Sequence, residues 1–335
     1  MILTLLLALV FSNPLLLGTG STPEIAQTDA GSVVLWKDNS LKVTLGGSNV
    51  TTTLLDRNPA AYAIATRGPE SVAVWADGAK ISAVRLDGRG VPIGDPKTIA
   101  TTTTAQVAIA SNGDRYLVAW SGLFGDIWAL ILDANGSLFL PPTPVTTQTI
   151  DTPTYVHVAS NGDEFLISWT ADRRVFAHLV GDNGFPHTFL PVQMTSVGGP
   201  SDVASNGHDF LVVWQRPPFG VGIGARAMFA NGAVSDEMLL TQGTDGEPRI
   251  AWDGAAYSVL FDSIVRSGSR DIPVRILQRF TATGSTIETA SGPFGVTHAI
   301  AARNGRIAVA TADSANVYLS YVDALPVPSR RRALR

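Results

Sequence analysis

The chain has 335 residues, of which 45% are hydrophobic and 16% charged, so it is long and apolar enough to bury a large core. Its formal charge is -4, and the arginines at the extreme C-terminus leave the rest of the chain more acidic still, which argues against a nucleic-acid partner. There is no cysteine, which excludes disulfides, thiolate metal sites and a cysteine nucleophile.

The chain begins with an apolar run at residues 2–11, followed by Pro14 and then by Gly18 and Gly20 at the spacing of a signal-peptidase site. This run is too short to cross a membrane, no Lys or Arg precedes it, and no later segment is apolar enough to span a bilayer. We interpret residues 1–21 as a signal peptide or apolar leader. The interpretation predicts an exported protein, periplasmic, at the cell surface or extracellular; a plain apolar N-terminus is the alternative.

A phrase of Ser-Asn-Gly, an aromatic residue, an aliphatic run and Trp then recurs, with copies that end at Trp120, Trp169 and Trp214. Seven turn glycines align, 37 to 51 residues apart: Gly31, Gly68, Gly113, Gly162, Gly207, Gly254 and Gly305. An alanine stands three residues before six of them, which predicts a position where neighbouring backbones approach closely. A repeat of this length indicates an array of similar structural units.

The unit around Gly162 shows four β-rich runs, at residues 154–160, 164–169, 174–180 and 189–196. Asn-Gly and other turn residues join these runs, and Asn-Gly favours hairpins between antiparallel strands. Four short antiparallel strands in each unit are typical of a propeller blade. We therefore predict an all-β chain whose residues 22–326 form a single β-propeller of seven four-stranded antiparallel blades. Six blades is the alternative, because the first unit is compressed.

The last unit looks incomplete. Its third strand is expected at residues 315–322, and only Asp323 to Ser329 remains to supply a fourth. We therefore expect a three-stranded final blade, or one with a short outer strand. Residues 327–335 form a basic C-terminal tail, which is either a solvated end or a contact with anionic lipid.

The repeats resemble those of exported bacterial β-propeller proteins, many of them uncharacterised or from cell-surface proteins. The resemblance rests on the Ser-Asn-Gly…Trp phrase and on two hairpins, "WALILDANGSLF" at residues 128–139 and "ARAMFANGAVSD" at residues 225–236. It covers roughly residues 22 to 326 and implies the fold rather than an activity. The proline of TolB-type turns and the Asp-box of sialidases are both absent from these units.

The alignment also predicts which residues reach the central channel. The first strand of each blade lines the channel in a propeller, and polar residues stand five or seven positions before the turn glycine. They are Glu24, Gln106, Tyr155, His157, Asp202, Glu247, Arg249 and His298. This ring can bind a small polar ligand, a metal ion or a loop of a partner. The alternative is a wet channel wall in which Arg249 only pairs with Asp202 or Glu247.

Three long loops on the same face, at residues 121–126, 215–222 and 262–271, form a second candidate surface. Aromatic residues next to arginine are typical of binding hot spots. The candidate residues are Phe124, Asp126, Arg216, Phe219, Arg266, Arg270 and Asp271. In the alternative interpretation, Phe124 and Phe219 fold back onto the rim of their blades.

These patterns favour a monomeric binding module that recognises a protein or a carbohydrate ligand, without a cofactor. We assign no catalytic residue and no metal site, because the histidines lack the spacing of known zinc motifs. One alternative is a glycan-active hydrolase or lyase that uses Glu24, Glu247, His157 or His298 at the channel mouth. Another is a structural repeat of a cell-surface assembly.

Overall fold

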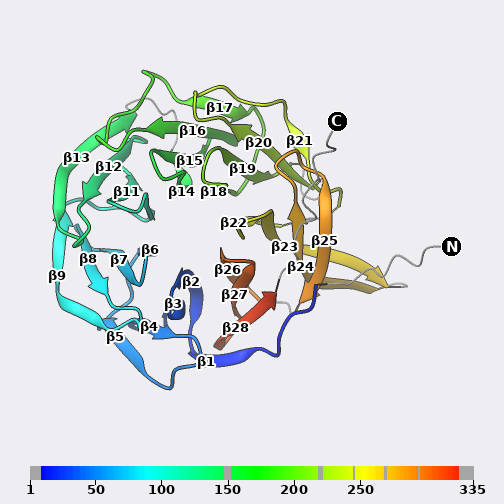
Figure 1. The fold of residues 1–335 in the computed structure, drawn as a ribbon, viewed down its shortest axis with the longest axis horizontal. Coiled ribbons are helices and arrows are strands. Elements are labelled where there is room, and N and C mark those ends of the chain that lie inside the picture. The colour runs from blue at the N-terminus through cyan, green and yellow to red at the C-terminus, as the bar shows by residue number, and fades with distance from the viewer. Residues whose placement is uncertain are drawn as a thin grey trace, which may run out of the picture.

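The computed structural model describes residues 9–146, 152–217, 222–243, 246–267, 270–292 and 295–323, among which there is no helix. The strands form seven four-stranded antiparallel sheets that surround a central channel (Figure 1). This arrangement is a seven-bladed β-propeller. The predicted fold is confirmed, and the six-bladed alternative is wrong.

Six blades follow the chain, each starting with its innermost strand. Blade one is β2 (Ser21–Thr28), β3 (Gly31–Lys37), β4 (Leu41–Leu45) and β5 (Thr51–Leu55); blade two is β6 (Ala61–Arg67), β7 (Glu70–Asp77), β8 (Lys80–Leu86) and β9 (Pro92–Ala100). Blade three is β10 (Val107–Ser111), β11 (Tyr116–Ser121), β12 (Ile127–Leu132) and β13 (Leu138–Thr146); blade four is β14 (Thr154–Ser160), β15 (Phe165–Ala171), β16 (Arg174–Val180) and β17 (Val192–Thr195). Blade five is β18 (Ser201–Ser205), β19 (Phe210–Gln215), β20 (Ile223–Met228) and β21 (Met238–Leu239); blade six is β22 (Arg249–Trp252), β23 (Tyr257–Ser267), β24 (Arg270–Phe280) and β25 (Thr286–Gly292).

Blade seven is built from both ends of the chain. It contains β26 (Thr297–Arg303), β27 (Arg306–Ala312) and β28 (Asn316–Asp323), and β1 (Leu15–Thr19) pairs antiparallel with β28 as the outer strand (Figure 1). The expectation of a three-stranded last blade is therefore wrong. Residues 15–19, which the sequence analysis assigned to the leader, supply the missing outer strand, so that blade seven has four strands like the others.

Side-chain packing holds this N-terminal segment in place. Leu9 is only 6% exposed and lies in a cluster between blades six and seven, with Leu260, Leu277, Ile307 and Val322. The segment is also tied to blade one: the Trp36 indole donates to the Thr19 carbonyl at 3.0 Å. Gly20 has a φ of +144°, and a Cβ atom there would lie 2.4 Å from the Trp36 ring. Removal of residues 1–21 would therefore remove a strand that the ring uses.

Burial between blades explains the repeated phrase. Each second strand is covered on both sides by neighbouring blades, so β11 and β15 are buried along their whole length. The repeated tryptophans fill these interfaces and are at most 2% exposed: Trp36, Trp75, Trp120, Trp169 and Trp214. The alanine column is buried there too, at Ala65, Ala110, Ala159 and Ala204. The other two alanines of the column, Ala251 and Ala302, are half-buried.

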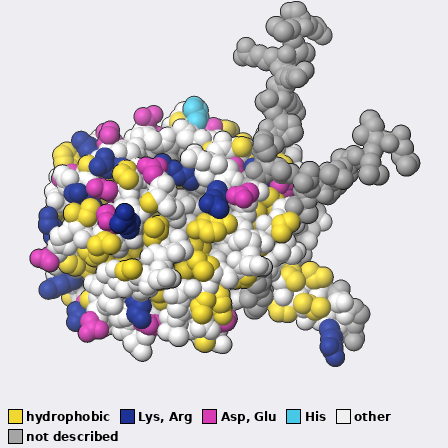
Figure 2. All heavy atoms as spheres, turned by 60° about the horizontal axis from the view of Figure 1, so that its bottom comes forward, with side chains coloured by type: hydrophobic (Ala, Val, Ile, Leu, Met, Phe, Trp, Pro, Cys, Tyr) yellow, Lys and Arg dark blue, Asp and Glu magenta, His cyan; other side chains and the backbone are white. Residues whose placement is uncertain are grey.

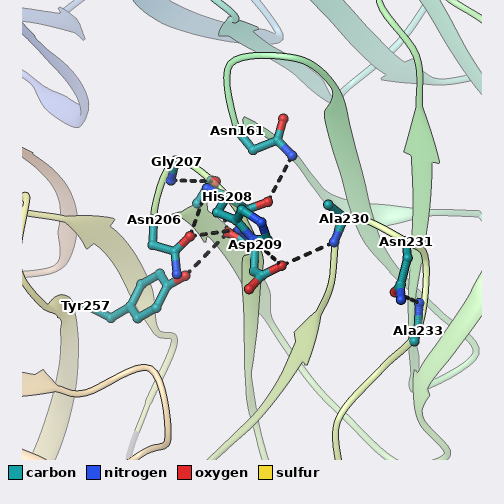
Figure 3. Close-up of polar contacts among 10 residues, drawn as sticks. Asn161, Asn206, Gly207, His208, Asp209, Ala230, Asn231, Ala233 and Tyr257 are labelled. Carbon is teal, nitrogen blue, oxygen red and sulfur yellow. Dashed lines mark hydrogen bonds and ion pairs between the residues drawn. The ribbon is translucent and has the colours of Figure 1, made fainter.

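The Asn-Gly turn of blade four reaches blade five (Figure 3). The side-chain oxygen of Asn161 accepts hydrogen bonds from the backbone N–H groups of Asp163 and Glu164, at 3.0 and 2.8 Å. Its amide nitrogen donates to the His208 carbonyl of blade five at 3.0 Å, which Figure 3 shows. Across the next interface, the Tyr257 hydroxyl reaches the Asp209 carbonyl at 3.5 Å. The turn residues therefore close the hairpin and join two sheets.

One hairpin extends beyond its sheet. β23 and β24 pair along eleven residues each, whereas the pairing of β24 with β25 ends at Arg275 and Gly292. The two strands therefore project from the ring at the right of Figure 1, and Figure 2 shows hydrophobic side chains on the projecting part. Val265 and Ile272 lie opposite each other there, at 47% and 45% exposure.

Deleting residues 1–20 should lower the urea concentration at the midpoint of unfolding, measured by tryptophan fluorescence. The deletion removes Leu9 and the outer strand of blade seven, and loss of one buried leucine side chain alone costs about 2–5 kcal/mol. Deleting only residues 1–8 is the control, because every described residue is kept. Equal midpoints for the two truncated proteins would contradict the closing role of β1.

Candidate binding site at the channel mouth

Polar side chains from five blades line a cavity of about 330 Å³ at one end of the channel. Its lining includes six of the eight predicted channel residues: Glu24, Gln106, Tyr155, His157, Glu247 and Arg249. His298 lies in a smaller recess of about 120 Å³, whose lining also includes Glu24, Glu247 and Arg249. The eighth residue, Asp202, is buried behind the wall. The two hollows together are called the channel mouth below.

Two β-bulges shape the channel mouth. The register of β2 with β3 shifts between Ser21 and Glu24, and that of β14 with β15 shifts between Thr154 and His157. Thr22 and Tyr155 lie within these shifts and have positive φ angles of 47° and 51°, which side-chain-bearing residues seldom adopt. Bulges of this kind re-aim side chains and often lie next to functional sites.

A chain of polar contacts crosses the channel wall. Arg249 donates from Nη1 to Nε2 of His157 at 3.1 Å and from Nη2 to the Glu247 carboxylate at 3.0 Å. Because arginine only donates, His157 Nε2 must be the accepting nitrogen, and the proton on Nδ1 points to Asp202 at 3.3 Å. Asp202 also accepts from the backbone N–H of Ile250 at 3.0 Å. Burial, assisted by the Arg249 charge and opposed by Asp202, lowers the pKa of His157 to about 4.

His298 is a second neutral histidine. Its Nε2 lies 3.1 Å from the Glu247 backbone carbonyl, which can only accept, so this nitrogen carries the proton. Burial and the charges of Arg275 and Arg249 lower the pKa of His298 to about 3. The nearby carboxylate of Asp262 is held by two hydrogen bonds from Arg275, at 2.8 and 3.2 Å.

Glu24 differs from the other carboxylates. No hydrogen bond or ion pair within the described part of the chain reaches its carboxyl group. The positive charge of Arg249, which binds His157 and Glu247, nevertheless acts to lower its pKa. Burial raises the pKa of Glu24 to about 7, which the Arg249 charge opposes and the charges of Asp202 and Glu247 reinforce. The half-buried carboxyl is therefore poised between its two protonation states near neutral pH.

Some of the loop residues predicted as a second surface are exposed, and others are paired with neighbouring side chains. Phe124 is 89% exposed and thus does not fold back onto its blade, whereas Asp126 accepts a hydrogen bond from the Trp128 indole at 2.5 Å. Arg216 forms an ion pair with Glu237, with 3.5 Å between Nε and Oε1. Arg270 and Asp271 are exposed at the start of β24. Phe219 and the side chain of Arg266 lie outside the described residues.

Asp262 is a channel-mouth residue that the sequence analysis did not select. It follows Phe261, the position equivalent to the tryptophan that ends each repeat, and therefore lies where the second strand reaches the mouth. The equivalent residue of blade one, Lys37, lines the larger cavity. The position after the aromatic column would have indicated both residues.

No group of three or more histidines, aspartates and glutamates within the described ranges has the arrangement of a metal site. A search of the same residues for a helix long and apolar enough to cross a membrane finds none.

No protein-family model and no curated protein matches the chain, but solved structures match most of its length. Hydrazine synthase of Kuenenia stuttgartiensis superposes with a TM-score of 0.59 at 14% identity, over 90% of this chain and 95% of that one. The Dos1 propeller gives 0.58 at 9% identity, over 93% and 94%. The WD40 domain of Toxoplasma gondii coronin gives 0.56 at 9%, over 97% and 88%. At these identities the likeness establishes the β-propeller fold alone.

The stability of the Glu24→Gln variant relative to wild type should be greater at pH 8 than at pH 5. A carboxyl whose pKa is raised to about 7 from 4.5 contributes stability that is complete below pH 4.5 and is lost as the pH rises through about 7. The glutamine side chain has no charge to bury, so the advantage of the variant should grow across this window by at most about 3 kcal/mol. Thermal unfolding at several pH values measures it.

Glu70→Gln, at the start of β7 and outside both hollows of the channel mouth, is the control for removing one carboxylate. Melting curves of wild type and Glu24→Gln that respond identically to pH would contradict the raised pKa.

Proposed function

We propose that this propeller is a binding module whose channel mouth recognises a polar group of a protein or carbohydrate ligand. The observation that carries the proposal is the convergence of partly buried ionisable side chains from separate blades on one open cavity. Arg249 is the centre of this group, because it joins His157 of blade four to Glu247 of blade six. Such contacts fix the polar groups before a ligand arrives, which lowers the entropy cost of binding.

The cavity suits a polar ligand more than an apolar one. Glu24 offers a carboxyl without a hydrogen-bond partner among the described residues, and Tyr155 and Gln106 add hydrogen-bonding groups to the wall. Hydrogen-bonding groups at fixed positions supply specificity in such pockets. Alanine residues, among them Ala61 and Ala63, leave the space between these groups open.

The loop at residues 122–126 is a second contact surface in this proposal. Val107 pairs with Trp120, and Ser121 pairs with Ile127, so the loop lies at the same end of blade three as Gln106. Leu123 and Phe124 are exposed there at 69% and 89%. A ligand larger than the cavity can therefore contact an apolar loop tip while its polar end enters the channel mouth.

Export and a monomeric state remain part of the proposal. Export is supported by the apolar run at the N-terminus, whose residues from Leu9 onward also pack into the fold. A cleavage at Gly18 or Gly20 would separate β1 from the chain that follows it.

Ala61→Trp should abolish ligand binding, because the indole would fill the cavity without changing its charge. The measurement is binding of the full chain to a glycan array and to an array of 15-residue peptides, with calorimetry on any ligand found. Ala233→Trp, in an exposed turn at the opposite end of the blades, is the control. A ligand that binds wild type and Ala61→Trp equally well would contradict recognition at the channel mouth.

A hydrolase is the second candidate, favoured by one observation. Glu24 and Glu247 line the same cavity, and the pKa of Glu24 is raised to about 7, as is required of a carboxylic acid that protonates a leaving group. This candidate predicts release of 4-methylumbelliferone from at least one glycoside of a fluorogenic panel, with the rate at least 100-fold lower in Glu24→Gln than in Glu70→Gln. Rates at the buffer background on every glycoside would eliminate it.

A further inference from the structure

The smaller recess of the channel mouth has a distinct chemistry. It lies where the first strands of blades one, six and seven meet, and Asp262 reaches it from β23. The ionisable residues of its lining are Glu24, Glu247, Arg249, Asp262 and His298. Two of the three carboxylates are already paired with arginine: Glu247 with Arg249, and Asp262 with Arg275.

His298 presents an acceptor that nothing in the described structure satisfies. The residue is 7% exposed, and its Nδ1 atom is buried without a hydrogen-bond partner among the described residues. Because Nε2 carries the proton that is donated to the Glu247 carbonyl, Nδ1 holds a lone pair. The nearest carboxylate oxygen, Oδ2 of Asp262, lies 3.8 Å away. Two acceptors thus face each other with no hydrogen between them.

An unpaired buried acceptor is costly, and native structures satisfy nearly all of them. Here the missing partner must be a donor, since neutral His298, Asp262 and Glu24 all offer lone pairs. It can also carry a positive charge, because the carboxyl group of Glu24 has no ion pair among the described residues, whereas Glu247 and Asp262 are paired with Arg249 and Arg275. A group with several N–H donors and a positive charge meets both conditions.

We propose that the recess binds a primary alkylammonium group. An ammonium carries three N–H donors on one compact centre, which fits acceptors that converge from Glu24, Asp262 and His298. A guanidinium spreads its donors over a planar fork and suits bidentate carboxylates instead. The inference rests on the proposed function, since it names the chemistry that the channel mouth recognises. The amine belongs either to a lysine side chain of a partner polypeptide or to a free small amine.

Calorimetry and NMR titration of the full chain at pH 8 test this inference with four probes. They are Nα-acetyl-lysine methylamide, its norleucine analogue, 1,4-diaminobutane and methyl glucoside. The lysine derivative or the diamine should bind, and the norleucine compound, which lacks only the ammonium, should bind at least ten times more weakly. Tighter binding of the lysine derivative would indicate a polypeptide source, and tighter binding of the diamine would indicate a free amine.

Glu24→Gln should weaken amine binding at least tenfold, whereas Glu70→Gln should leave it unchanged. In the wild type, the Nδ1 resonance of His298 should shift on titration with the amine, because its lone pair gains a donor; this readout needs no variant to fold. Equal affinity for the lysine and norleucine compounds, or an unmoved His298 resonance during amine binding, would overturn the inference.

The same experiment separates this inference from the proposed function. If neither amine binds, the alkylammonium inference is wrong. The channel mouth remains a binding site in that case if methyl glucoside or an array ligand binds to wild type and Ala61→Trp abolishes this binding. If array ligands bind regardless of Ala61→Trp, the proposed function itself is wrong.

Discussion

The whole structure depends on the need to bury both faces of every blade. The second strands are apolar on both sides, so a sheet exposed at either face would leave its tryptophan and aliphatic side chains in water. Only a closed ring satisfies all seven sheets at once. Closure requires that the last blade be complete, and β1 completes it by pairing with β28 while Leu9 fills the interface of blades six and seven.

The ring also creates the electrostatics of the channel mouth. Closure brings the ends of first strands from distant parts of the chain together, and burial removes water from their ionisable groups. For His157 the effect of burial exceeds the attraction of Asp202, so the imidazole stays neutral and serves as an acceptor for Arg249. For Glu24 the effect of burial exceeds the attraction of Arg249, so the carboxyl binds a proton readily.

The repeat predicted much of this, because the turn glycine fixes the register of a hairpin and therefore the direction of each side chain. Counting back five residues from Gly162 and Gly254 places His157 and Arg249 at the mouth, and counting back seven from Gly31 places Glu24 there. The count fails for β1 because the pairing of Leu15 with Leu319 is not a local relation in the sequence. It also does not reveal that Thr22 and Tyr155 adopt positive φ angles, since neither residue type favours them.

The central claim is that the mouth is a preorganised polar site in which neutral His157 connects Asp202 to Arg249. The nitrogen chemical shifts of the His157 ring, recorded by long-range proton–nitrogen NMR between pH 5 and 8, test it most directly. We predict a neutral ring throughout this range, with the proton on Nδ1 and an unprotonated Nε2. A ring that becomes positively charged near pH 6.5, or one that carries its proton on Nε2, would contradict the account.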